Sequence, residues 1–263
     1  MRMKRGDSIN SASAEESLEL SIVIPCYNEI NRLPRTMKQL ETFLQNFSIP
    51  LEIVVVDDGS RDETATWVRK YSESDRRVRL VSYGGNRGKG YAVTQGMLAA
   101  KGRYRVFMDA DGSTPVEYIE NFLRIMKERS ADIVIGSRKE IGAQLQATQS
   151  LPRRSASQLF ALLTRLLVVY GVKDTQCGFK MFTKEASDSI FSRTTVAGAI
   201  FDIELMLLAA DLRYRVAEIP VTWTHDDDSR LTYNLRKSLM IFVELMRVKF
   251  RHRILLPRKV QPA

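Results

Sequence analysis

Short apolar runs alternate with amphipathic helical patterns over the first two thirds of this 263-residue chain. Apolar runs rich in β-branched residues predict five strands, at 20–24, 52–56, 77–81, 103–108 and 131–135. Apolar residues at helical spacing between them predict helices near 32–46, 61–74, 88–100 and 115–129. Strands and helices in alternation indicate an α/β fold, with a mostly parallel sheet covered by helices.

The pattern changes after residue 150. Apolar residues recur at helical spacing over 159–170 and predict a helix packed on the core, although the same stripe could serve another surface. The stretch 238–251 has a broad apolar face bordered by cations, which is typical of a helix at a membrane interface, and packing on the core is an equal alternative. We expect three segments, namely a disordered leader at 1–17, one α/β domain at 18–228 and a basic amphipathic C-terminal segment at 229–263.

The formal net charge of +9 is concentrated near the C-terminus, because the sequence beyond residue 229 contains nine lysines and arginines and a single acid, Glu244. Such an excess favours an anionic partner, which could be a phosphorylated substrate, an acidic lipid surface or a nucleic acid. Aromatic residues interleaved with the cations are not evident, and acids at the predicted strand ends would repel phosphates that lack a metal. We therefore expect no nucleic acid, which leaves a phosphorylated substrate or a membrane surface as the anionic partner.

The cysteine content indicates the compartment. Cys26 and Cys177 are too few for a disulfide framework, which favours a reducing, cytoplasmic environment. Residues 1–17 are polar and contain no apolar core of the kind that a signal peptide requires. No run of 18 apolar residues occurs, so we expect a soluble protein or one peripherally attached to the cytoplasmic membrane face.

Asp109 and Asp111 follow the predicted strand 103–108 and are the strongest candidates for chemistry. Side chains at i and i+2 of an extended backbone point to the same side, so both acids could face one divalent cation. A solvated turn is the alternative for an isolated pair. The other predicted strands also lead into polar or glycine-rich turns, at 25–29, 57–60, 83–90 and 136–138. Because ligands of open α/β sheets bind at the carboxyl ends of the strands, we expect one shared site holding Mg²⁺ or Mn²⁺.

Two of these turns suggest how a ligand would be held. Asp57 and Asp58 suit hydrogen bonds to ribose hydroxyls or to the N–H groups of a base, and Ser60 could cap the next helix. The sequence 86–90 opens a helix, so its amides and cations, Lys89 included, could hold an anion. It has neither the ending of a phosphate-binding P-loop nor the dinucleotide fingerprint.

In order and spacing, these motifs resemble the inverting family 2 glycosyltransferases of GT-A fold. The residues that carry the resemblance are 24–29, 56–60 with Asp62, 86–90, 109–111 and 136–138. Two later motifs, at 172–180 and 201–204, are most similar to dolichyl-phosphate β-glucosyltransferases and next to dolichyl-phosphate mannosyltransferases. The resemblance implies a single-domain enzyme that moves glucose from UDP-glucose to a dolichyl or polyprenyl phosphate with inversion.

The resemblance also implies residue roles. Donor-binding roles would fall to Pro25, Tyr27, Glu29, Asp57, Asp58, Lys89 and Asp109. Asp109 and Asp111 would reach the diphosphate through the metal, whereas Ser113 stands where the mannosyltransferases have a further glutamine ligand. Arg138 and Arg153 would hold the acceptor phosphate, with Arg154 competing with Arg153. Substrate contacts are further expected from Gln176, Asp202 and Glu204, where the two acids would bind sugar hydroxyls or order the site.

A phosphate acceptor changes what catalysis requires. A phosphomonoester has a second pKa near ~6, so it is mostly dianionic at neutral pH and needs no protein base. Asp109, Asp111 and Arg138 are then the catalytic candidates, acting through positioning and charge. Three rivals stay open: a mannosyltransferase using GDP-mannose, a transferase to a glycan hydroxyl with Asp202 or Glu204 as base, and a non-catalytic sugar-nucleotide sensor.

Overall fold

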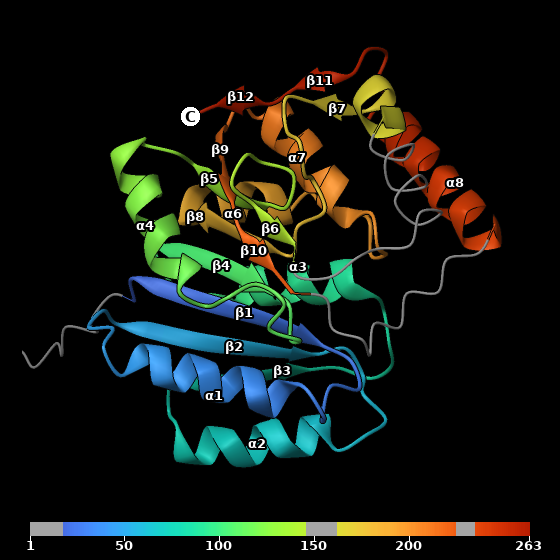
Figure 1. The fold of residues 1–263 in the computed structure, drawn as a ribbon. Coiled ribbons are helices and arrows are strands. Elements are labelled where there is room, and N and C mark those ends of the chain that lie inside the picture. Colours follow the sequence, from blue (N-terminus) through green and yellow to red (C-terminus); the bar gives the residue numbers. More distant parts are fainter. Residues whose placement is uncertain (1–17, 146–161, 225–234) are drawn as a thin grey trace, which may run out of the picture.

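The computed structural model describes residues 18–145, 162–224 and 235–263 (Figure 1). Its centre is an eight-stranded sheet with the order β12-β9-β5-β8-β4-β1-β2-β3. The predicted strands are all present, as β1 Leu20–Cys26, β2 Leu51–Asp57, β3 Val78–Ser82, β4 Tyr104–Met108 and β5 Ile133–Ser137. The predicted helices are present as α1 Leu33–Leu44, α2 Thr64–Ser74, α3 Lys89–Ala99 and α4 Tyr118–Glu128. The prediction of a mostly parallel sheet covered by helices is confirmed.

One strand, β8 Phe179–Thr183, runs against the rest of the sheet. It lies between β4 and β5 and is antiparallel to both, while the other pairings in this sheet are parallel. Its first residue pairs with the last residue of β4, as Met108 is opposite Phe179. The turn that leads into β8 therefore reaches the carboxyl ends of its neighbours. The apolar pattern of the first two thirds gave no sign of this strand.

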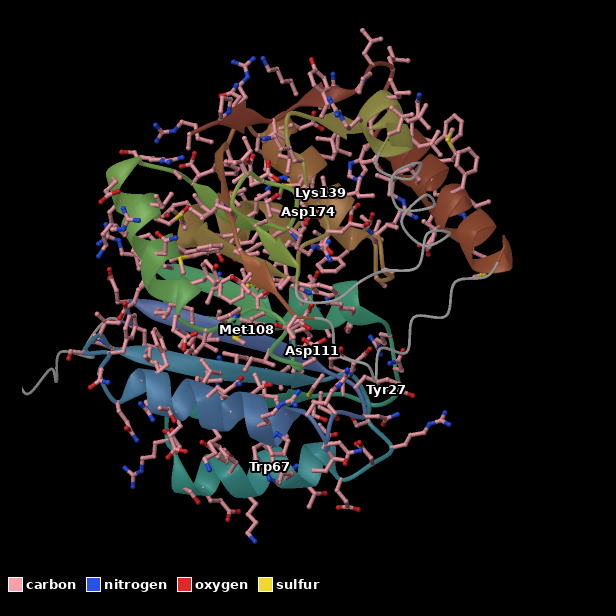
Figure 2. All side chains as sticks on the ribbon, in the orientation of Figure 1. Tyr27, Trp67, Met108, Asp111, Lys139 and Asp174 are labelled. Atoms are coloured by element: carbon pink, nitrogen blue, oxygen red, sulfur yellow. The ribbon has the colours of Figure 1, made fainter. Side chains whose placement is uncertain are left out.

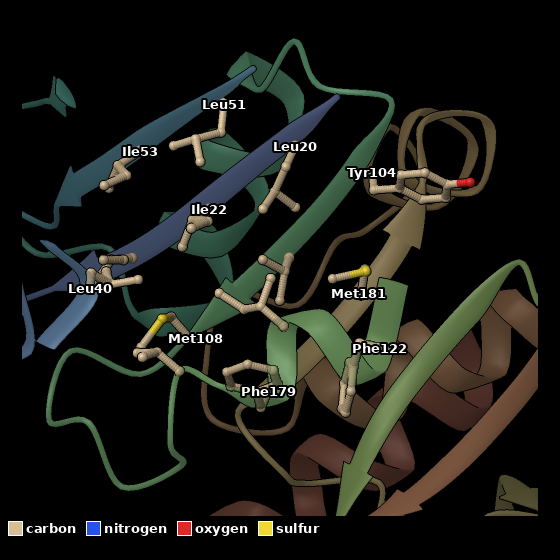
Figure 3. Packing of buried hydrophobic residues seen from close by; sticks show 14 of the residues in the cluster. Leu20, Ile22, Leu40, Leu51, Ile53, Tyr104, Met108, Phe122, Phe179 and Met181 are labelled. Carbon is tan, nitrogen blue, oxygen red and sulfur yellow. The ribbon is translucent and has the colours of Figure 1, made fainter. Parts of the chain in front are cut away.

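The two faces of the sheet carry separate halves of the core. Alternation along each strand directs Ile22 and Ile24 to the face covered by α1 and α4, and Val23 to the opposite face. The first face carries the cluster drawn in Figure 3, which includes Leu20, Ile53, Leu40 of α1 and Phe122 of α4. The second face is covered by α3, α6 Lys184–Phe191 and α7 Phe201–Asp211. Burial on both faces explains why these strands read as continuous apolar runs.

The C-terminal segment continues the fold beyond the predicted helix. Helix α8, Leu235–Arg251, includes the predicted stretch 238–251 and forms the red outer layer at the right of Figure 1. Its Leu245 and Val248 are buried in the second half of the core, while Phe250 is 72% exposed. Strand β12 Gln261–Pro262 then pairs with β9 Arg215–Pro220 at the edge of the main sheet. The last residues are therefore part of the sheet.

Two short ladders complete the description. β6 Gln144–Leu145 pairs with β10 Thr222–Trp223, and β7 Val169–Tyr170 pairs with β11 Arg258–Lys259. The prediction of one helix over 159–170 is wrong at its end, because the helical backbone stops at residue 167 and the chain extends to pair with β11. Among the described residues, no helix is long and apolar enough to span a bilayer. The leader 1–17, the pair Arg153 and Arg154, and the boundary at 228 lie outside the described residues.

Candidate functional site

Asp109 and Asp111 lie where β4 ends, at the carboxyl edge of the sheet (Figure 2 labels Met108 and Asp111). Two contacts fix the turn that carries them. Thr36 Oγ1 of α1 donates to the Ala110 carbonyl at 2.8 Å, and Ser113 N donates to Asp111 Oδ1 at 2.9 Å. Ala110 is buried, whereas both aspartates are partly exposed. The chain thus buries Ala110 and leaves both carboxylates partly exposed at the end of β4, in a turn and not in the extended backbone on which the i, i+2 argument rested.

A cation already faces one of these acids. Lys89 Nζ, at the start of α3, lies 2.5 Å from Asp109 Oδ1. Burial opposes the charge on Lys89, but the nearby carboxylates of Asp109, Asp202 and Asp111 outweigh it and raise its pKa above the usual value. The other side of Asp109 meets backbone, because a Cβ built on Gly178 would lie 2.1 Å from Asp109 Oδ2. The close approach of β8 to β4 thus depends on a glycine beside the carboxylate.

The donor set suits a divalent cation shared with a phosphorylated ligand. Two aspartate carboxylates supply hard oxygen ligands, and the ammonium of Lys89 beside Asp109 could contact a phosphate that the metal also binds. Within the described ranges, no group of three or more His, Cys, Asp or Glu side chains is arranged to hold a metal alone. Mg²⁺ and Mn²⁺ are often bound by one or two carboxylates completed by substrate phosphates, so the residues fit such an ion.

The ends of β1 and β2 form the neighbouring part of the site. Asp57 is 2% exposed, and its carboxylate accepts from Ser60 N at 3.1 Å and from Ser82 Oγ at 3.2 Å. Pro25 belongs to β1, and Tyr27 directly follows that strand (Figure 2). Glu29 forms an ion pair with Arg32 and is partly exposed. The four residues predicted to hold a nucleoside are thus brought to one edge by the parallel pairing of β1 with β2.

The Asp58 carboxylate binds other groups of the protein. It is 2% exposed, and its carboxylate accepts from Arg87 N at 2.7 Å, Gly88 N at 2.9 Å and Tyr83 Oη at 3.0 Å. These bonds hold the segment 86–90, which we call the glycine loop, against the end of β2. Direct contact of Asp58 with a nucleotide stays a prediction. In the structure, Asp58 fixes the loop that carries Lys89.

Arg138 directly follows β5 and is held by an acid that the sequence did not single out. Asp174 accepts from Arg138 Nε at 2.7 Å and from Nη2 at 2.9 Å, and its own side chain is 1% exposed. Although burial opposes its charge, this guanidinium lowers the pKa of Asp174 to about 2. Arg138 remains 25% exposed and lies 5.6 Å from the centre of the Trp223 ring. Gln176, two residues beyond Asp174, is exposed.

Asp202 and Glu204 lie at the start of α7, and both are buried. Asp202 is 4% exposed and pairs with the fully buried Lys180 of β8. Burial raises the pKa of Asp202, against the pull of Lys180 and Lys89. Glu204 is 0% exposed and accepts hydrogen bonds from the 195–196 backbone. This burial does not fit a direct contact between Glu204 and substrate and favours the predicted alternative, that Glu204 orders the site.

Several residues of the site escaped sequence reasoning. Asp174 and Gly178 lie inside the quoted motif 172–180, but nothing in the spacing says that one pairs with Arg138 and the other packs on Asp109. Lys180 offered a usable signal, since it is a lysine within an apolar strand, and a buried cation needs an anionic partner. Trp223, beside Arg138, carried no such signal.

Comparisons with known proteins agree with this geometry. The family model for Glycosyl transferase family 2 matches residues 21–191. A dolichyl-phosphate beta-glucosyltransferase of Dictyostelium discoideum is 35% identical over 90% of this chain and 76% of its own length. One from Drosophila melanogaster is 38% identical over 82% of this chain and 70% of its own length.

A solved structure shows that the similarity extends to the fold. Glucosyl-3-phosphoglycerate synthase of Mycobacterium tuberculosis, crystallised with Mn²⁺, UDP and phosphoglyceric acid, superposes with a TM-score of 0.61 at 17% identity. The match covers 89% of this chain and 78% of that protein. The GT-A prediction is confirmed by this shared architecture. The chain therefore belongs to Glycosyl transferase family 2, and it is a glycosyltransferase of GT-A fold.

Proposed function

We propose that this glycosyltransferase moves glucose from UDP-glucose to a dolichyl or polyprenyl phosphate, with inversion and with the help of Mg²⁺ or Mn²⁺. The observation that carries the proposal is the similarity, over 90% of the chain, to an enzyme named dolichyl-phosphate beta-glucosyltransferase. The site supports it independently, because carboxylates for a metal and an arginine for an acceptor phosphate lie at the ends of strands in one sheet.

The donor would lie across the ends of β1, β2 and β4. Pro25, Tyr27, Glu29 and Asp57 would hold the nucleoside, where a buried carboxylate such as Asp57 can accept from hydroxyl or N–H groups. Asp109 and Asp111 would bind the metal, which supplies positive charge to the diphosphate leaving group. Lys89 would share that task, because its ammonium already contacts Asp109.

The acceptor phosphate would be held by Arg138 and Arg153, with Gln176 and Asp202 contributing to the sugar or acceptor side. Asp174 fixes the direction of the Arg138 fork, and planar guanidinium groups suit phosphate oxygens. An acceptor phosphate oxygen would attack C1 of glucose from the face opposite the diphosphate. The new C1–O bond forms as the bond from C1 to the UDP oxygen breaks, which inverts the anomeric centre and releases UDP.

The two acids of α7 support a mechanism without a protein base. Asp202 is paired with Lys180, and Glu204 is buried among hydrogen-bond donors. A dianionic phosphate arrives ready to attack, so its proton need not be removed. The raised pKa of Asp202 is the one observation that favours the rival in which it acts as base toward a glycan hydroxyl.

The C-terminal segment would attach the enzyme to the cytoplasmic face of a membrane, where a lipid acceptor resides. Phe250, Leu255 and Leu256 are 72%, 90% and 73% exposed, respectively. The cations Arg251 and Arg253 accompany them and are also exposed. Apolar side chains beside cations bind anionic lipid surfaces. Replacing Leu255 and Leu256 by serine should lower binding to anionic vesicles about 10-fold in flotation assays.

One incubation tests the proposed reaction. The full chain is mixed with polyprenyl phosphate, Mg²⁺ or Mn²⁺ and, in parallel, radiolabelled UDP-glucose and GDP-mannose. Label should move from UDP-glucose into an organic-extractable lipid, and a chelator should stop it. Asp202→Asn should weaken substrate binding but lower kcat by no more than about 10-fold, less than the roughly 100-fold or more that loss of a general base costs, because the acceptor brings its own negative charge.

Four outcomes would contradict the proposal. Transfer from GDP-mannose would assign a different donor, and transfer only to oligosaccharides would assign a hydroxyl acceptor. Binding of donor without transfer to any acceptor would indicate a sensor. A loss of turnover in Asp202→Asn with donor affinity intact would replace the base-free mechanism with base catalysis.

A further inference from the structure

Glu204 joins two parts of the chain that lie far apart in sequence. Its carboxylate accepts from Thr195 Oγ1 at 2.6 Å, Val196 N at 2.8 Å and Thr195 N at 2.9 Å. His252 Nε2, just beyond α8, lies 2.7 Å from the same carboxylate. Because Glu204 is 0% exposed, these partners replace the water that a carboxylate otherwise needs. One buried acid thus links the loop before α7 to the C-terminal segment.

The loop at 195–198 presses on the glycine loop. A Cβ built on Gly88 would lie 2.5 Å from the Ala197 carbonyl oxygen, and one on Gly90 would lie 2.5 Å from the Val196 carbonyl oxygen. Tyr91 N also donates to the Ala197 carbonyl at 3.3 Å. These backbone contacts flank Lys89 on both sides, and Lys89 reaches Asp109. The position of the 195–198 loop therefore sets where the start of α3 can lie.

Helix α8 touches this loop at further points. Arg251 Nη1 donates to Thr195 Oγ1 at 2.8 Å, and a Cβ on Gly198 would lie 3.1 Å from Glu244 Oε1. Leu245 and Val248 anchor the same helix in the core. Figure 1 shows α8 as an outer layer next to the body of the protein. Contact between α8 and the 195–198 loop is thus made at both the middle and the end of the helix.

We propose that Glu204 is a positioning residue through which the C-terminal end of α8 holds the glycine loop, and with it Lys89, in place for donor binding. Glu204 does not touch substrate in this arrangement, because it is buried behind the loop that it holds. The connection runs from His252 to Glu204, then to Thr195 and Val196, and then to the glycine loop. It rests on the proposed function only in taking the donor to be UDP-glucose.

Three variants test the connection in the full chain. Glu204→Gln removes an acceptor for backbone amides, and His252→Gln removes the C-terminal contact while leaving Glu204 in place. The matched control is Asp211→Asn at the other end of α7, which breaks a contact of Asp211 Oδ1 with Arg258 Nε at 2.8 Å. This control loosens the same C-terminal segment without touching the 195–198 loop.

The measurements are the KM for UDP-glucose, kcat, and hydrogen exchange of the amides from Arg87 to Tyr91. Glu204→Gln and His252→Gln should raise the donor KM about 5- to 10-fold, keep kcat within about 2-fold, and speed exchange in the glycine loop. Asp211→Asn should match the wild type in all three. If Glu204→Gln does not fold, His252→Gln and Thr195→Val are compared with the wild type instead, since both leave the buried carboxylate in place. The same rise in donor KM and faster loop exchange are expected of them.

Two results would overturn the proposal. An unchanged donor KM and unchanged exchange in His252→Gln would show that the C-terminal segment does not act on the loop. An equal rise in KM in Asp211→Asn would show general loosening instead of a specific link. If the wild type fails to use UDP-glucose, the proposed function fails, whereas loop exchange in the same variants still decides the connection.

Discussion

The carboxylates on the two sides of the site are held in different ways. On the side of β1, β2 and β4, Asp57, Asp58 and Asp111 accept chiefly from backbone amides and hydroxyls. On the side of β8 and α7, Asp174 and Asp202 pair with Arg138 and Lys180. Among the described residues, Asp109 is the one aspartate of the first side that pairs with a cation, Lys89, whereas both aspartates of the second side have cation partners. The first side is therefore suited to a metal ion, and the second to a rigid wall for an anionic acceptor.

The largest expected effect comes from the acids at the end of β4. Asp111→Asn should reduce transfer at least about 1000-fold, equivalent to about 4 kcal/mol of transition-state stabilisation, because it removes a metal ligand. Thermal stability should change little, because Asp111 is partly exposed and accepts one backbone bond from Ser113. Near-normal transfer in this variant would show that Asp111 does not hold a metal that the reaction needs. Activity is measured by transfer of label and stability by calorimetry.

Gly178→Ala tests whether the second side shapes the first. A Cβ there would lie 2.1 Å from Asp109 Oδ2, so the carboxylate must turn away. We expect about a 100-fold loss of kcat/KM, near 3 kcal/mol, with a small change in melting temperature, because only the end of a side chain moves. Gly84→Ala is the matched control, since its Cβ would meet nothing within 4 Å. Equal activity of the two variants would show that Asp109 tolerates displacement.

Asp174→Asn tests how much the ion pair with Arg138, on the side of β8 and α7, contributes to the stability of the fold. Arg138 holds the pKa of Asp174 at about 2 instead of 3.8, so the ionised pair stabilises the fold fully above pH 3.8 and less as the pH falls toward 2. At pH 7 the variant should lose about 2 kcal/mol of unfolding free energy, measured by urea titration. The difference from wild type should shrink as the pH falls below about 4. A difference independent of pH would indicate lost packing as the cause.

The smallest effect is expected at Lys89, which connects the two sides. Lys89→Met keeps the length of the side chain and removes the charge that contacts Asp109. Its side chain is 41% exposed, so we expect only about a 10-fold weaker donor affinity, near 1.4 kcal/mol, read by calorimetry with UDP-glucose and Mn²⁺. Affinity for the metal alone should rise or stay level, because a competing cation is gone. Weaker binding of metal alone would contradict this account.

The sequence predicted the donor side better than the acceptor side, for a physical reason. Motifs at 25–29, 57–60 and 109–111 each follow a strand that pairs in parallel with its neighbour, so periodicity alone brings them to one edge. Arg138 was found by the same logic. Its partner Asp174 and the buried pair of Lys180 with Asp202 depend on β8, an antiparallel strand whose place between β4 and β5 no local pattern encodes.

The burial of Glu204 illustrates a second limit. The sequence left two roles open for Asp202 and Glu204, binding sugar hydroxyls or ordering the site, because it does not show which way residues two positions apart on a helix point. The Glu204 side chain points toward the 195–198 loop and toward His252, a residue 48 positions later in the chain. Such a contact depends on where the chain beyond α8 returns to the body of the protein, and periodicity within a helix does not predict it.

The place of β8 also determines how the sheet can assemble during synthesis. Strands β1 to β4 form a contiguous four-stranded unit in the order β3-β2-β1-β4, and they can pair once residue 108 has emerged. β5 must wait, because its neighbours β8 and β9 come later in the chain. Until then the free edge of β4 is open to pairing with other chains, since an unpaired strand edge is an aggregation hazard. We expect the nascent protein to depend most on chaperones between the emergence of β4 and that of β8, before the residues of β8 and α7 that would contact the acceptor have been made.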